Sequence, residues 1–221
     1  MNILVCVDRD GTINLDENYF LGSSPNWKEQ LEFLPRVVEG IKALNQISDL
    51  EIAIVTNQAG VALTDPQFQP LDEERMHEVN QYMIEQLKKQ GAIIQNYFAT
   101  PYVNSAYVEK SKQRGRNVNP QYVQDNNPNL KPSPGMIFKA AERLGKKPEE
   151  LRIYMIGDRK SDVETGLNAN SFSILIPSSK TIEIGDEEKV RELQKEHPNQ
   201  IYIAKDFLDA AQYIEKHQHN L

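Results

Sequence analysis

The chain has 221 residues and a formal net charge of −7, with 39% hydrophobic and 26% charged residues. These values are typical of a globular protein, and the acidic balance argues against a broad polyanion-binding surface, which needs clustered Lys and Arg. The single cysteine, Cys6, excludes a disulfide within the chain and argues against a cysteine-based zinc site. The sequence shows neither a signal peptide nor an apolar run near the ~18 residues of a membrane span. We therefore expect a cytoplasmic protein.

Short apolar runs that alternate with helical patterns are the main structural signal. The runs predict six strands, at Ile3–Val7, Glu51–Val55, Ile93–Ala99, Arg152–Ile156, Phe172–Ile176 and Ile201–Ala204. Apolar residues at helical spacing predict helices near residues 37–44, 76–91, 133–145 and 206–214. This alternation predicts an α/β fold, a Rossmann-like three-layer sandwich with a central parallel sheet. In such sheets the ligand site lies at the carboxyl ends of the strands.

Two polar segments depart from this pattern. Residues 100–130 hold little apolar periodicity and much Asn, Pro, Gln and Lys, and residues 178–200 form a second insertion with a short charged helix near 186–196. Loops of such length are uncommon in compact domains and are often functional. We expect one domain over residues 1–221 that carries these two insertions. No apolar-patterned insertion of about 60 residues is present to build a large cap domain.

Two acidic residues directly follow the first predicted strand. They are Asp8 and Asp10, in the string Val7-Asp8-Arg9-Asp10-Gly11-Thr12. Side chains alternate along an extended chain, so both carboxylates project the same way and repel each other. A divalent cation removes that repulsion, and oxygen ligands favour Mg²⁺. A strand-ending turn with solvated acids is the simpler alternative.

Hydrogen-bond donors follow the second predicted strand. The hydroxyl of Thr56, the amides of Asn57 and Gln58 and the backbone near Gly60 are suited to bind phosphate oxygens. Alternatively, Thr56 or Asn57 caps a helix, which is a common use of these residue types.

A lysine and two further acids lie later in the chain. Lys131 precedes a proline-started helix, where its ammonium can neutralise a phosphate and a carboxylate, although it can also be an ordinary surface lysine. Asp158 follows the fourth strand and Asp162 lies one helical turn later on the same side, unless the two form only a turn and an N-cap. The combination is specific, because phosphoryl transfer to a carboxylate requires a nucleophile, a cation, phosphate donors and a neutralising lysine.

The four motifs resemble those of the haloacid dehalogenase (HAD) superfamily of phosphatases. The branch that contains the histidinol-phosphate and heptose-bisphosphate phosphatases is similar in the strings Asp8-Arg9-Asp10-Gly11-Thr12-Ile13-Asn14, Thr56-Asn57-Gln58, Lys131-Pro132-Ser133-Pro134-Gly135-Met136 and Ile156-Gly157-Asp158-Arg159. The resemblance covers nearly the whole chain to about Ile176, and the closing strand and helix also fit.

This chain departs from the resembled branch at two places. Many members carry a Cys/His zinc loop before the lysine motif, whereas Thr100–Leu130 contains no Cys and no His. No zinc is therefore expected. Heptose phosphatases tend to have an arginine before the lysine, and Leu130 in that place argues against that substrate.

The resemblance implies the catalytic and metal-binding roles. Asp8 would be the nucleophile, and Asp10 would protonate the leaving oxygen and then activate the hydrolytic water. Mg²⁺ would be held by a carboxylate oxygen of Asp8, the backbone carbonyl of Asp10 and the carboxylate of Asp158.

The resemblance also implies how the phosphate and the substrate would be held. Thr56 and Lys131 would bind the transferring phosphoryl group, and Asp162 would orient Lys131 or a metal-bound water. Contacts to the rest of the substrate would come from Asn57, Gln58 and Arg159.

We therefore predict a Mg²⁺-dependent phosphatase that hydrolyses a phosphate monoester of a small metabolite, such as a sugar phosphate or histidinol phosphate, through an aspartyl-phosphate intermediate. A polynucleotide 3′-phosphatase is the alternative enzyme, against which the acidic charge counts. A regulatory phospho-acceptor domain like bacterial receivers is the non-enzymatic alternative, against which the chain length and Asp10 count. The expected partner is a small phosphorylated metabolite rather than a nucleic acid or a membrane, and a monomer is favoured.

A cluster of basic residues in the first insertion has two possible roles. It can clamp a second anionic group of the substrate, or it can be a solvated loop. The cluster consists of Lys110, Lys112, Arg114 and Arg116.

Overall fold

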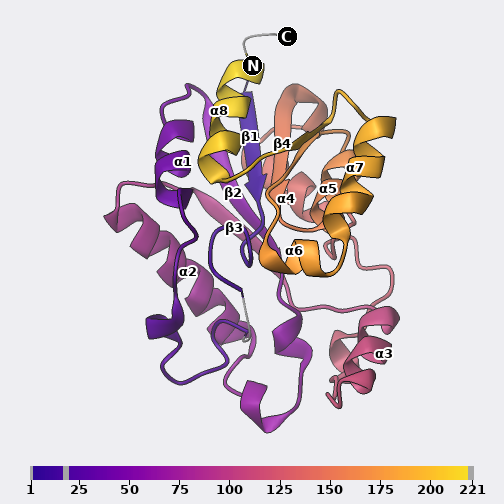
Figure 1. Cartoon of the computed structure of the whole chain (residues 1–221). Coiled ribbons are helices and arrows are strands. Elements are labelled where there is room, and N and C mark those ends of the chain that lie inside the picture. The colour runs from indigo at the N-terminus through magenta and orange to yellow at the C-terminus, as the bar shows by residue number, and fades with distance from the viewer. Residues whose placement is uncertain (1, 17–19, 219–221) are drawn as a thin grey trace.

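Six parallel strands form the central sheet of the computed structural model (Figure 1), which describes residues 2–16 and 20–218. The strands are β1 (Asn2–Val7), β2 (Leu50–Asn57), β3 (Asn96–Thr100), β4 (Leu151–Gly157), β5 (Phe172–Leu175) and β6 (Ile201–Ile203). They lie side by side in the order β3-β2-β1-β4-β5-β6, and every pair is parallel. Successive strands are added on one side of β1 up to β3 and on its other side from β4 onward. The order of the strands therefore reverses between β1 and β4, and open α/β sheets bind their ligands at such a point. The predicted α/β fold is thus confirmed.

Helices cover both faces of this sheet (Figure 1). One face carries α1 (Val37–Leu44), α2 (Glu73–Lys89) and α8 (Phe207–His217). The other face carries α4 (Gly135–Arg143), α5 (Lys160–Asn168) and α7 (Asp186–Glu196). Single-turn 3₁₀ helices lie in the connections, at η1 (Trp27–Gln30), η2 (Ala59–Ala62), η3 (Pro66–Phe68), η4 (Pro120–Tyr122) and η5 (Pro148–Glu150).

The side chains of β1 alternate between two hydrophobic cores. Ile3, Val5 and Val7 lie in the core that contains residues of α1, α2 and α8, whereas Leu4 and Cys6 lie in the core with α4. A strand buried on both faces reads as a continuous apolar run, which is why the sequence revealed it. Continued past the strand, this alternation directs residue 8 toward the α4 side and residue 9 toward the α2 side.

The third strand begins later than predicted. The prediction covered Ile93–Ala99, whereas β3 begins at Asn96. The side chain of Asn45 accepts a hydrogen bond from the Ile93 N–H (2.8 Å) and donates one to its carbonyl (2.9 Å). These bonds satisfy the backbone at residue 93 outside the sheet, so the sheet ladder starts only after it.

The first polar insertion contains a helix, α3 (Ser105–Gln113), that the sequence did not reveal. Ser111 is its one buried residue among those described, so the helix has no apolar stripe to recognise. Its first turn is held by Asp125 instead, which accepts bonds of 2.7 Å from both the N–H and the hydroxyl of Ser105. An isolated β-bridge between Val103 and Val123 connects the two ends of the segment.

The second insertion contains α6 (Ser179–Glu183) and α7, the charged helix that was predicted. Between β1 and β2, the described residues form only η1 and α1, and no large cap domain is built there. Because all six strands share one sheet, we propose that the chain is one domain. Within the described part of the chain, no helix combines the length and the apolar character needed to cross a membrane.

Candidate active site

Side chains from separate motifs meet at the carboxyl ends of β1 and β4. Lys131, just before α4, places its Nζ 2.7 Å from Oδ1 of Asp8 and 2.6 Å from Oδ1 of Asp162. One oxygen each from Asp8, Asp158 and Asp162 lies within 4.8 Å of the others. The structure therefore brings together a lysine and three carboxylates that stand as many as 154 positions apart in the sequence (8 to 162).

Two glycines allow these acids to approach one another. A Cβ on Gly11 would lie 2.4 Å from Oδ2 of Asp158, and Gly11 has a φ of +84°, which other residues rarely adopt. A Cβ on Gly157 would lie 2.3 Å from the Cβ of Asp162. Any side chain at either position would push an acid out of the cluster.

The cluster holds more negative charge than its lysine can neutralise. Burial, followed by the charge of Asp162, raises the pKa of Asp8 to about 8 although Lys131 opposes the shift. Burial and then Asp162 likewise raise the pKa of Asp158 to about 7. Burial acts to lower the pKa of Lys131, but Asp162 and Asp8 hold it above its ordinary value.

The free oxygens of the cluster fit a divalent cation. Oδ1 of Asp158 is buried and has no hydrogen-bond partner among the described residues. The bonds to Asp8 from the Lys131 ammonium and from the Arg9 N–H, both 2.7 Å, go to the same oxygen, Oδ1. Carboxylate oxygens that are buried, unpaired and close together are ligands suited to Mg²⁺.

Asp162 uses both of its oxygens within the protein. Oδ1 accepts from the Lys131 ammonium, and Oδ2 accepts from the backbone N–H of Arg159 at 2.9 Å, which caps α5. Asp162 is therefore placed to orient the Lys131 side chain, which is one of the two roles that the resemblance implies for it.

Asp10 has a different set of partners. Its carboxylate accepts bonds from Arg9 (3.1 and 2.8 Å), Gln58 (2.8 Å) and Asn14 (3.1 Å). Burial alone would raise the pKa of Asp10, but the charge of Arg9 and these hydrogen bonds together hold it below its ordinary value. Asp10 is therefore ionised in the free protein, and its side chain is 25% exposed.

The hydrogen-bonding side chains at the end of β2 mostly bind other residues of the site. The Thr56 hydroxyl accepts a 2.8 Å bond from Gln58, which leaves its own proton free to point elsewhere. Asn57 accepts from the N–H of Lys131 at 3.1 Å and donates to its carbonyl at 3.4 Å, so it fixes the lysine backbone. Arg159 is 28% exposed, with Nε 3.4 Å from Oδ2 of Asp158.

The sequence did not reveal the residues that brace Asp158. The Ser178 hydroxyl donates to Oδ2 of Asp158 at 2.7 Å, and the Thr181 hydroxyl donates to the Asp158 backbone carbonyl. Both residues belong to the start of α6, in the second polar insertion. Strands β4 and β5 are neighbours, so their ends bring residues 158 and 178 together. A serine at a helix start signals only a cap, and nothing in the sequence connects it with an acid 20 residues away.

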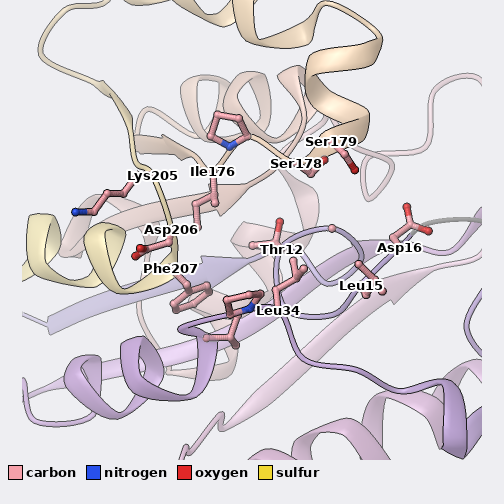
Figure 2. A pocket seen from close by; sticks show the side chains of 14 residues that line it. Thr12, Leu15, Asp16, Leu34, Ile176, Ser178, Ser179, Lys205, Asp206 and Phe207 are labelled. Carbon is pink, nitrogen blue, oxygen red and sulfur yellow. The ribbon is translucent and has the colours of Figure 1, made fainter.

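A cavity of about 220 Å³ lies beside the acid cluster (Figure 2). Figure 2 shows Thr12 and Ser178 on its walls, and Gly11 also lines it. Its lining includes neither Asp8 nor Lys131. The cavity therefore shares Gly11 and Ser178, which lie against Asp158, with the surroundings of the cluster.

Comparison with known proteins gives three kinds of similarity. Residues 130–210 match the HAD-hydrolase-like family. The D-glycero-beta-D-manno-heptose-1,7-bisphosphate 7-phosphatases of Mesorhizobium japonicum and Escherichia coli are both 27% identical to this chain. The alignment with the Mesorhizobium protein covers 74% of this chain and 64% of that protein. The alignment with the Escherichia coli protein covers 80% of this chain and 81% of that protein. The crystal structure of D,D-heptose 1,7-bisphosphate phosphatase from B. bronchiseptica, complexed with magnesium and phosphate, superposes with a TM-score of 0.67 at 20% identity, over 97% of this chain and 99% of that one.

The fold and these similarities are those of the HAD-like hydrolases, which the chain resembles. The relatives are named as phosphatases, in agreement with the motifs of the sequence.

Proposed function

We propose that the chain is a Mg²⁺-dependent phosphatase that hydrolyses a phosphate monoester of a small metabolite through an aspartyl phosphate on Asp8. The main support is the contact between Asp8 and Lys131 within a buried acid cluster that has an unpaired oxygen on Asp158. The Asp8 and Asp158 carboxylates and the Asp10 backbone carbonyl would hold the ion. When bound, Mg²⁺ supplies the positive charge that the cluster lacks and neutralises phosphate oxygens.

In the first proposed step, Asp8 attacks the phosphorus of the bound ester. The oxygen of Asp8 forms a bond to phosphorus while the bond from phosphorus to the ester oxygen breaks. Asp10 gives its proton to the leaving alcohol. Lys131 and the free hydroxyl proton of Thr56 bind the phosphoryl oxygens as negative charge moves onto them.

In the second proposed step, water attacks the aspartyl phosphate. Asp10, now a carboxylate, takes a proton from the water, whose oxygen bonds to phosphorus as the bond to Asp8 breaks. Inorganic phosphate leaves and both acids return to their starting state. The lowered pKa of Asp10 in the free protein keeps its carboxylate ionised, as acceptance of that proton requires. The negative charge of an entering phosphate would raise that pKa and supply the acid form for the first step.

The proposed substrate class is a sugar phosphate, with histidinol phosphate as the other candidate. The activity of the relatives toward a heptose bisphosphate supports the sugar, whereas Leu130 before the lysine argues against the same heptose. Arg116 of the basic loop lies over the rings of Phe20 (5.7 Å) and Phe68 (5.3 Å), so part of its surface packs within the protein. The anion clamp, the cytoplasmic location and the monomer stay predictions.

A panel of phosphorylated metabolites with Mg²⁺ present tests this proposal. Phosphate release should be fastest, by kcat/KM, for a sugar phosphate or histidinol phosphate. A 3′-phosphorylated oligonucleotide in the same panel represents the alternative enzyme. Turnover of that oligonucleotide alone would favour the polynucleotide phosphatase, which the net charge of −7 disfavours.

Mg²⁺ should stabilise the protein more as the pH rises. Asp8 and Asp158 have pKa values of about 8 and about 7, above the ordinary 3.8. Their contribution to stability is therefore fully present below the ordinary pKa and is lost as the pH rises through the raised values. In EDTA, each carboxyl should lower the free energy of unfolding by up to about 1.4 kcal/mol per pH unit, from about pH 4 to about pH 8 for Asp8 and to about pH 7 for Asp158.

Denaturation curves with EDTA and with Mg²⁺, recorded across this pH range, measure that effect. The quantity to compare is the difference between the two conditions, because other acids titrate equally in both. A Mg²⁺ increment that is independent of pH would show that the ion does not bind these carboxylates.

Replacement of Ser178 should weaken Mg²⁺ binding. Ser178→Ala removes the 2.7 Å bond that orients the Asp158 carboxylate, and loss of such a supporting bond typically costs 10–100-fold in metal affinity. Calorimetric titration with Mg²⁺ measures this directly. Ser179→Ala is the matched control, because Ser179 is the exposed neighbour. Equal affinities of the two variants would argue against a role of α6 in the metal site.

A further inference from the structure

Arg9 lies between the two aspartates of the first motif and is almost fully buried, with 1% of its side chain exposed. A buried guanidinium is unfavourable unless its charge and its donors are satisfied. Arg9 forms a fork on Asp10, with Nε 3.1 Å from Oδ1 and Nη2 2.8 Å from Oδ2. Both oxygens of Asp10 are therefore fixed by one rigid group.

Gln58, which directly follows β2, binds the same carboxylate. Its carbonyl accepts from Nη2 of Arg9 at 2.6 Å, and its amide donates to Oδ2 of Asp10 and to Thr56, both at 2.8 Å. These partners allow only one orientation of the amide, because an inverted amide would face the guanidinium with its own donors. Gln58 is 5% exposed, so its amide group forms its hydrogen bonds with buried residues of the protein.

Asn80 of α2 anchors the other end of Arg9. It is fully buried, and its amide donates to the carbonyl of Met76 at 2.8 Å, one helical turn earlier. This bond turns its carbonyl toward Nη1 of Arg9, at 3.3 Å. Arg9 reaches Asn80 because side chains alternate along β1, and this alternation places residue 9, like Val5 and Val7, on the α2 side of the sheet.

We propose that Arg9 and Gln58 are positioning residues that hold the Asp10 carboxylate for proton transfer to the leaving group, with Asn80 as their anchor. The proposal rests on the proposed function of Asp10. Arg9 is buried, which removes it from direct contact with a substrate. A carboxylate held at both oxygens cannot rotate away from the leaving oxygen, and proton transfer depends steeply on such geometry.

A series of substituted phenyl phosphates separates this role from a purely structural one. These substrates have nearly the same shape but differ in the basicity of the phenolate that leaves. A positioned acid is needed for a basic leaving group and contributes little for an acidic one. The quantity to measure is kcat/KM, which reports the step that forms the aspartyl phosphate.

Gln58→Met is the main variant, because it removes the three hydrogen bonds of the Gln58 amide group and leaves the pair of Arg9 and Asp10 in place. We expect kcat/KM to fall about 100-fold for phenyl phosphate and less than about 5-fold for 2,4-dinitrophenyl phosphate. Asn80→Ala should show the same trend, smaller in size, although Asn80 does not contact Asp10. The matched control is Gln113→Met, on the exposed end of α3.

The outcomes are distinct. An equal loss for all leaving groups in both variants, or no loss in either, would overturn the positioning role while the wild-type enzyme remains active. Asp10→Asn provides the reference for complete loss of the acid and should show the steepest dependence on the leaving group. Wild-type protein that hydrolyses none of the phenyl phosphates or metabolites would instead refute the proposed function itself.

Discussion

Asp8→Asn should abolish phosphate release and leave the protein folded. The amide cannot attack phosphorus, and loss of a catalytic nucleophile typically lowers kcat by 10⁴-fold or more. The same change should not destabilise the metal-free protein. Burial and then the charge of Asp162 raise the pKa of Asp8 to about 8, so a neutral side chain is favoured at this position, and Lys131 keeps its ion pair with Asp162. The measurements are kcat on the best substrate of the panel and the unfolding midpoint in EDTA.

Asp72→Asn is the matched control for this change. Asp72 is the exposed N-cap of α2, where it accepts from the Arg75 N–H at 2.7 Å, and Asn caps helices about as well as Asp. The control should keep full activity. Turnover by Asp8→Asn above a trace would refute the assignment of the nucleophile.

Lys131→Met should damage activity and stability together. The variant removes the cation that lies 2.7 Å from Asp8 and 2.6 Å from Asp162, and it leaves those carboxylates buried without their partner. Breaking a buried ion pair from one side costs about 3–5 kcal/mol of unfolding free energy. The loss of charge on the transferring phosphoryl group should lower kcat/KM by about 10³-fold.

A second substitution separates the two effects of Lys131→Met. Adding Asp162→Asn removes one unpaired charge and should restore part of the stability but none of the activity. Lys139→Met, on the exposed face of α4, is the control for the loss of a lysine. Wild-type stability in Lys131→Met would show that the ion pairs do not form.

The sequence predicted the fold, and it singled out the residues that the structure brings together at the edge of the sheet, because both depend on local patterns. Strands buried on both faces are continuous apolar runs, and parallel strands bring whatever follows them to one edge. Asp8, Thr56 and Asp158 were found in this way. Lys131 was found from its place before a helix.

The partners of these residues could not be predicted from local patterns. Gln58 was expected to touch substrate but lies against Arg9 and Asp10, and Asn57 holds the backbone of Lys131. Such pairings depend on side-chain directions across different strands, which no spacing in one segment encodes. Helix α3 was missed for a related reason, since it is held by caps and not by an apolar face.

The two glycines beneath the acids restrict how this enzyme can evolve. Any larger residue would collide with Asp158 at position 11 or with Asp162 at position 157. No substitution at either glycine is therefore expected to be neutral. A change of substrate would have to come from residues other than these two glycines. Among related sequences, Gly11 and Gly157 should therefore stay unchanged while the residues around the site vary.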